Sequence, residues 1–154
     1  MKRFREYINE VLNKPVPWQW YNKDKYNYSA KFRVGDASYE VWLDNNTVPY
    51  GDNFHQDDWE LVFRLSHLVG NPDVSAYGIT KTGGELVVFS TVIEIVKAFV
   101  REKQPGRIWF TAKEESRKRL YKAFLALVSR QIPGYTGHLN TDPTTPGTYV
   151  IEKD

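Results

Sequence analysis

A long apolar segment from Leu86 to Lys103 constrains the fold of this chain more than any other stretch. The segment contains no glycine or proline, and its length favours a helix over the strands that its β-branched residues would also suit. Apolar residues occupy more than one side of such a helix: Leu86, Val87, Val88, Phe89, Val92, Ile93, Ile95, Val96, Phe99 and Val100. A helix that is apolar on several sides lies deep in a domain. The sequence therefore predicts a buried helix around which the other elements pack.

Shorter elements surround this helix. An amphipathic helix is predicted over residues 2–13, where Pro15 and Pro17 end it. Alternation of apolar and polar residues predicts strands at 28–34, 38–43 and 59–65. Three more short strands are predicted at 74–80, 107–111 and 149–151, and a last helix over about 113–130. This order predicts an α+β fold, with a mixed, mostly antiparallel central sheet flanked by helices and a local βαβ unit.

Composition limits the kinds of protein that this chain can be. The 154 residues predict one domain, 1–154, because a second domain would have no room for a core of its own. The chain has no cysteine, which excludes disulfides, thiolate metal sites and a cysteine nucleophile. The N-terminal residues lack the apolar run of a signal peptide, and no segment has the roughly 18 to 20 apolar residues that span a bilayer. We therefore expect a cytoplasmic protein with no membrane partner.

Charge and histidine placement argue against two further classes. The 21 basic and 19 acidic residues give a net charge of +2, which is too balanced to supply a strong phosphate-binding field, so nucleic acid could bind only at a local patch. The polar loop over 45–58 contains His55 with Asp52, Asp57 and Asp58, but their spacing fits no established ligand pattern. No metal site is predicted.

The clearest chemical signal is the glycine-containing loop that precedes the buried helix. Glycine lets a backbone approach a phosphate closely, and the free N–H groups of a helix N-terminus bind anions. A Gly-Gly pair before a helix is also an ordinary turn, so both interpretations stay open. The residues of the predicted anion site are Ile79, Thr80, Lys81, Thr82, Gly83, Gly84, Glu85 and Leu86.

The segment from Ser75 onward resembles the core of the GNAT superfamily of acyl-CoA-dependent N-acetyltransferases. In that family a glycine-containing loop of the form Gln/Arg-x-x-Gly-x-Gly/Ala follows the fourth strand, and this chain has Lys81-Thr82-Gly83-Gly84 there. The family's last helix carries an aromatic residue that Leu120-Tyr121 matches, and Gly134-Tyr135 stands for its later Gly-Phe. Glu114 occupies the place of the family's asparagine. Chains with this arrangement also resemble small bacteriophage proteins.

The resemblance implies a cofactor, a substrate class and roles for particular residues. The cofactor would be acetyl-CoA, with Arg117 near its 3′-phosphate, and the acceptor would be an unidentified amine. Tyr121 would protonate the leaving thiolate, since tyrosine is mostly protonated at neutral pH. A carboxylate on a middle strand would serve as the general base, and we select Glu60 over Glu40 and Asp57. Tyr121 at helical spacing also fits ordinary core packing, and Glu60 fits an ordinary solvated side chain.

A second interpretation belongs to a different class. The scaffold would be retained while catalysis had lapsed, and the protein would be a phage structural or virion component, or a protein that interacts with the host. It would then act in the host cytoplasm or in the virion. Its partner would bind an aromatic surface. The candidate residues for that surface are Trp18, Trp20, Tyr21, Tyr26 and Trp42.

Overall fold

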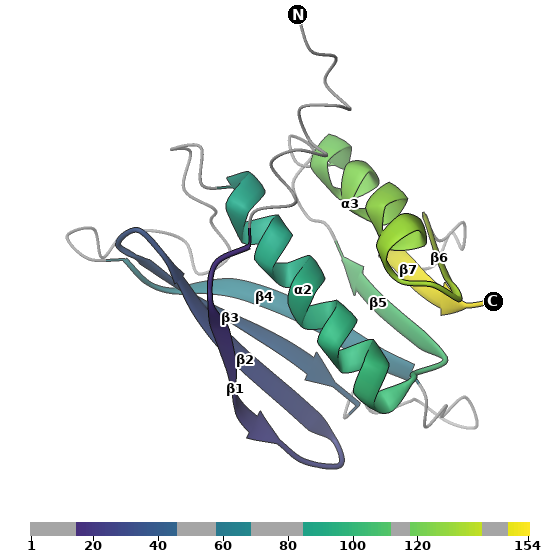
Figure 1. Ribbon diagram of the computed structural model, residues 1–154, viewed down its shortest axis with the longest axis horizontal. Coiled ribbons are helices and arrows are strands. Elements are labelled where there is room, and N and C mark those ends of the chain that lie inside the picture. The colour runs from purple at the N-terminus through teal and green to yellow at the C-terminus, as the bar shows by residue number, and fades with distance from the viewer. Residues whose placement is uncertain (1–14, 46–57, 69–84, 112–117, 140–147) are drawn as a thin grey trace, which may run out of the picture.

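The computed structural model describes residues 15–45, 58–68, 85–111, 118–139 and 148–154. In these ranges the chain forms seven strands and two helices (Figure 1). The strands are β1 Trp18–Lys23, β2 Asn27–Val34, β3 Ala37–Asp44, β4 Asp58–Leu68, β5 Arg107–Thr111, β6 Tyr135–Leu139 and β7 Thr148–Lys153. The helices are α2 Glu85–Lys103 and α3 Lys118–Gln131.

All seven strands belong to one sheet, in the order β1-β2-β3-β4-β5-β7-β6. Strands β1 to β4 are sequential antiparallel neighbours, and β7 lies between β5 and β6, antiparallel to both. Only β4 and β5 are paired in parallel among the described strands. The sheet therefore consists of two antiparallel parts joined through one parallel pair.

Helix α2 crosses the sheet and is buried on most of its sides, which confirms the buried helix predicted from the sequence (Figure 1). Phe99 is fully buried, and its ring meets those of Tyr28 on β2 and Trp59 on β4 at centroid distances of 5.2 and 4.9 Å. The helix ends where Gln104 takes a left-handed conformation with φ of 48°. Its observed start at Glu85 lies one residue before the predicted one.

Helix α3 lies on the same side of the sheet as α2, over the strands of the C-terminal part (Figure 1). It approaches β6 so closely that a Cβ atom on Gly137 would come within 2.8 Å of the Leu125 side chain and 3.1 Å of its backbone oxygen. Only a glycine fits this contact without displacing the helix.

Strand residues alternate between a side that faces the helices and a side that does not. In β3 the side chains of Ala37, Tyr39, Val41 and Leu43 are all buried, while the residues between them are half-buried. We call the second side of β1 to β4 the open face, and its members include Lys31, Glu40, Trp42, Glu60 and Arg64. No helix among the described residues covers the open face (Figure 1).

The predicted fold class is wrong. Most of the structure is one seven-stranded sheet, with two helices among the described residues, so the protein has a sheet-dominated fold and not an α+β fold of the N-acetyltransferase type. Two strands that were not predicted, β1 and β6, contribute to this difference, and β4 extends three residues beyond the predicted 59–65 to Leu68. The predicted helix at 2–13 and strand at 74–80 lie outside the described residues.

Candidate functional site

Strands β4 and β5 pair in parallel over a short stretch and then separate. Three residue pairs join the strands, from Asp58 with Arg107 to Glu60 with Trp109. Arg107 holds the start of this pair through two hydrogen bonds to Asp58, from Nε to Oδ1 at 3.2 Å and from a terminal nitrogen to Oδ2 at 2.8 Å. Beyond Trp109, β5 pairs with β7 but not with β4, and the two strands diverge (Figure 1).

Helix α2 connects these two strands, so its direction follows from theirs. A helix that joins two parallel neighbouring strands runs back along the sheet, antiparallel to both. The N-terminus of α2 at Glu85 therefore lies at the end of the sheet where β4 and β5 have diverged. Unpaired N–H groups at a helix N-terminus attract anions.

An aromatic cluster lies beneath this end of α2, on the helix side of the sheet. Phe89 on α2 contacts Phe63 on β4 at a centroid distance of 5.3 Å and Tyr121 on α3 at 5.5 Å. Tyr121 also lies 5.8 Å from both Phe110 on β5 and Tyr149 on β7. The cluster links β4 to β5 where their backbones no longer pair. Tyr121 is 8% exposed, so it belongs to the core, and its ring lies next to Phe110, beyond the last residue pair between β4 and β5.

Glu60 lies on the open face, at the last residue pair between β4 and β5. On its other side it stands opposite Asp44 of β3. Burial raises the pKa of Glu60 above its ordinary value of 4.5, and the negative charge of Asp44 raises it further. A carboxylate with a raised pKa is a better proton acceptor than an ordinary one.

The raised pKa predicts how Glu60 affects stability. Because the folded state favours the protonated form, the contribution of Glu60 is fully present below about pH 4.5 and is lost as the pH rises through its raised pKa. We expect Glu60→Gln to be more stable than the original protein at pH 7 and to lose that advantage below pH 4.5. Urea unfolding of both proteins at the two pH values measures this, and an equal difference at both would contradict it.

The two predicted catalytic residues lie on opposite sides of the sheet. Tyr121 belongs to the helix side, and Glu60 belongs to the open face. The backbone of the sheet lies between the two sides, and β4 and β5 pair through Glu60 and Trp109 before they diverge.

The predicted anion site is described only in part. Residues Ile79 to Gly84 and Arg117 lie outside the described residues, as do Asp57 and His55. For Glu85 and Leu86 the structure describes the backbone, which forms the first turn of α2. Glu40, the other described carboxylate considered as a base, forms an ion pair with Arg64 at 3.4 Å.

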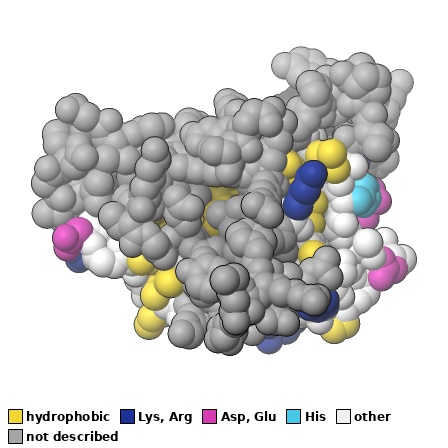
Figure 2. Space-filling model, turned by 90° about the horizontal axis from the view of Figure 1, so that it is seen from above, with side chains coloured by type: hydrophobic (Ala, Val, Ile, Leu, Met, Phe, Trp, Pro, Cys, Tyr) yellow, Lys and Arg dark blue, Asp and Glu magenta, His cyan; other side chains and the backbone are white. Residues whose placement is uncertain are grey.

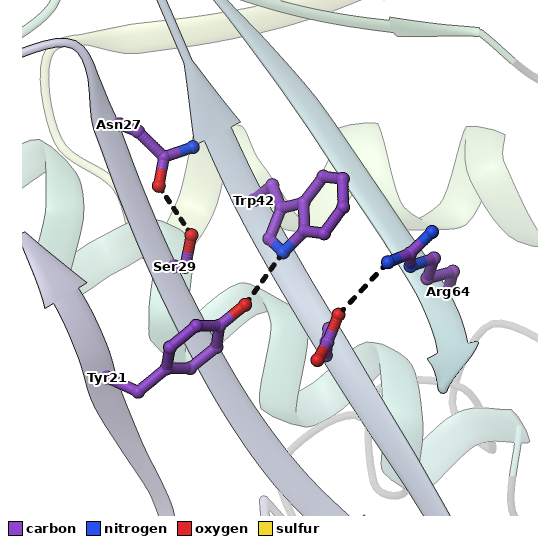
Figure 3. Close-up of polar contacts among 6 residues, drawn as sticks. Tyr21, Asn27, Ser29, Trp42 and Arg64 are labelled. Atoms are coloured by element: carbon purple, nitrogen blue, oxygen red, sulfur yellow. Dashed lines mark hydrogen bonds and ion pairs between the residues drawn. The ribbon is translucent and has the colours of Figure 1, made fainter. Parts of the chain in front are cut away.

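The predicted aromatic surface is divided between the core and the open face. Trp18 and Trp20 pack edge to face with one another at 5.1 Å, and Trp20 packs in the same way on Tyr28, so both indoles belong to the margin of the core. On the open face, Trp42 donates a hydrogen bond from Nε1 to the Tyr21 hydroxyl at 2.9 Å (Figure 3). The Arg64 guanidinium stacks 4.2 Å from the Trp42 ring on the other side.

Charges on the surface are mixed. On the part of the described surface visible in Figure 2, basic and acidic side chains are scattered, and neither sign forms a continuous patch. Among the described residues, no helix combines the length and apolar character needed to cross a bilayer.

Two contacts at the β4–β5 pair were not predicted from the sequence. Arg107 and Asp58 are 49 positions apart, and Asp44 meets Glu60 only through the pairing of β3 with β4. The available signal was the strand period, which places Glu60 and Trp109 on the side opposite the buried Trp59 and Ile108.

Comparisons with protein-family models, curated proteins and solved structures found no match to this chain. The functional argument therefore depends on the residues and their arrangement alone.

Proposed function

We propose that the protein is an acyl-CoA-dependent N-acetyltransferase that transfers an acetyl group from acetyl-CoA to an amine. The observation that carries the proposal is the divergence of β4 and β5 after Glu60 and Trp109, beside the N-terminus of α2. The proposal depends on this local arrangement and not on the overall fold class.

The diverging strands suit an extended ligand that carries amides. Where β4 and β5 no longer pair with each other, their facing N–H and C=O groups require other partners. The pantetheine arm of coenzyme A is a flexible chain with amide groups, and it would supply such partners in the manner of an added strand. Its pyrophosphate would then reach the N-terminus of α2, next to Gly83 and Gly84 in the sequence.

The reaction requires one bond to form and one to break. The amine nitrogen attacks the thioester carbonyl, a C–N bond replaces the C–S bond, and the thiolate leaves. In this proposal Glu60 accepts the proton of the amine from the open face, and Tyr121 donates a proton to the thiolate from the helix side. Most of the rate would come from positioning and from backbone donors that polarise the carbonyl. Such a protein would work in the cytoplasm.

One observation supports the alternative hypothesis that the protein binds a protein partner. Tyr21 and Tyr26 are large aromatic residues with exposed fractions of 45% and 46%, at the β1–β2 end of the open face. Exposed tyrosines are typical of protein interfaces. This second candidate, a virion component or a host-binding protein, predicts no affinity for acetyl-CoA.

A titration with acetyl-CoA and with coenzyme A tests the proposal. A ligand at about 100 times its Kd stabilises a fold by about 2.7 kcal/mol, so a thermal shift should accompany the heat of binding. Gly83→Val and Lys81→Ala should weaken binding. Lys25→Ala removes the same charge at the other end of α2, near the Lys23–Glu102 ion pair, and should not. Absence of binding at millimolar ligand would overturn the proposal and favour the interaction-protein hypothesis.

A further inference from the structure

Positive charges lie at one end of the open face. Side chains on one side of paired strands form rows across a sheet, and successive rows are two residues, or about 7 Å, apart. Lys31, Glu40 and Arg64 form one row, because the register pairs Glu40 with Lys31 on β2 and with Arg64 on β4. Arg33 lies in the next row, opposite Ser38. Three cations and one carboxylate give this end, which we call the basic end, an excess of two positive charges.

The other end of the same face is acidic. Asp44 is paired with Asn27 on β2 and with Glu60 on β4, so two half-buried carboxylates stand side by side in one row. We call this row the acidic end. Burial and the charge of Asp44 raise the pKa of Glu60, so the ionised form of this pair is costly in the isolated chain. Cations placed over the acidic end would lower that cost.

An uncharged row separates the two ends. Trp42 lies between Ser29 on β2 and Val62 on β4, one row from the basic end and one from the acidic end. Its Nε1 donates to the Tyr21 hydroxyl, and the Arg64 guanidinium stacks 4.2 Å from its ring, so both neighbours hold the indole in place (Figure 3). Trp42 is half-buried, and Tyr21 is 45% exposed. The open face therefore has an aromatic centre and opposite charges at its two ends.

We infer that the open face binds the open face of a second copy of this chain. A two-fold axis that lies between two stacked faces, perpendicular to their strands, reverses the strand direction of one copy relative to the other. The basic end of each copy then lies over the acidic end of the other, and the two Trp42 side chains meet at the centre. Stacked sheets keep their strands nearly aligned, as this arrangement does. A partner of a single charge sign would be repelled at one end of the face.

The size of the face predicts a weak, reversible dimer. Four strands about 4.8 Å apart, with eight residues of about 3.3 Å each in β2 and β3, cover about 500 Å² per copy. A stable complex of standard size buries about 800 Å² per partner. The inference does not rest on acetyl transfer. A second copy would cover Glu60, so under the proposed function the dimer and the amine acceptor compete for the acidic end.

Sedimentation velocity of the full chain tests the inference, over about 5 to about 500 µM protein. At low salt the fraction of dimer should rise with protein concentration. Sodium chloride at about 0.5 M should weaken the dimer by at least about tenfold, because salt screens charges at an exposed interface. A protein that stays monomeric over the whole range, or a dimer that salt does not weaken, would overturn the inference.

Two charge-reversal variants identify the face. The Lys31→Glu, Arg33→Glu variant has two acidic ends, and the Asp44→Lys, Glu60→Lys variant has two basic ends, so each should be monomeric alone. Mixed in equal amounts, they should form a heterodimer at least as tightly as the original protein forms its dimer. If the acidic-end reversal does not fold, Asp44→Asn, Glu60→Gln removes the same charges and should also prevent self-association. Folded variants that still dimerise alone, or that do not associate when mixed, would overturn the inference.

The matched control for these variants is Lys122→Glu, Arg130→Glu. It makes the same change of charge at two exposed positions of α3, on the other side of the sheet. Its dimer should therefore have a Kd within about twofold of the original value. Equal weakening by this control would show that only the net charge of the chain matters, and would overturn the assignment of the open face as the interface.

Discussion

Replacing Tyr121 by Phe is expected to lower the turnover of acetyl transfer by about 10²- to 10⁴-fold, the usual contribution of a positioned general acid. The variant keeps the ring that packs on Phe89 and Phe110 and loses only the hydroxyl. Affinity for acetyl-CoA should therefore change little. Steady-state kinetics with a panel of amines, combined with calorimetry of acetyl-CoA binding, separates the two effects.

Tyr135→Phe is the matched control for this variant. Tyr135 is also a buried tyrosine, but its hydroxyl donates to the backbone oxygen of Pro105 at 2.6 Å, at the start of β5 and away from the divergence. Its loss should lower stability by about 1 kcal/mol and leave turnover unchanged. If both variants lost the same fraction of activity, the role of Tyr121 would be structural.

Replacing Phe99 by Ala is expected to destabilise the fold by about 3 to 5 kcal/mol, a large fraction of the about 5 to 15 kcal/mol that stabilises a typical protein. Phe99 is fully buried, and its ring joins β2 and β4 to α2 through Tyr28 and Trp59. Truncation would leave a cavity in the centre of the N-terminal part. Urea unfolding followed by circular dichroism measures the loss.

Tyr26→Ala provides the comparison for Phe99→Ala. Tyr26 is 46% exposed, so its removal should change the free energy of unfolding by less than about 0.5 kcal/mol. A cost for Phe99→Ala below about 1.5 kcal/mol would show that the contacts around α2 are looser than the structure indicates.

The strands with an unbroken period of two were predictable from the sequence, and two others were not. In β2 and β3 every second residue is buried or partly buried on the helix side, so alternation alone predicts these strands to within one residue at either end. In β1 the run of aromatic residues hides the alternation, because Trp18 and Trp20 face the core side while Tyr21 lies on the open face, and a bulge between Trp20 and Asn22 then shifts the register. Strand β6 buries only Tyr135, and Gly137 is kept small by Leu125.

In the candidate site too, features set by local sequence were predicted, and features set by strand pairing were not. Sequence reasoning identified α2 from a long apolar run without glycine or proline, and the inward position of Tyr121 from helical periodicity. The placement of Glu60 at the last β4–β5 pair depends on strand pairing, and so does its proximity to Asp44. The pairing of distant strands cannot be read from the local pattern of residues in either strand. The predicted fold class was wrong for the same reason, because a seven-stranded sheet is a sum of such pairings.

The position of β7 between β5 and β6 means that the C-terminal part of the sheet can be completed only after β7 has been synthesised. β7 is the only described strand that joins β5 to β6, yet it comes after both in the chain. The antiparallel neighbours β1 to β4 can assemble from short-range contacts, whereas the C-terminal part must wait for a long-range insertion between two strands that were made earlier. During synthesis β5 and β6 therefore leave the ribosome before their common partner β7, and the edges that β7 will pair with are exposed to aggregation in this interval.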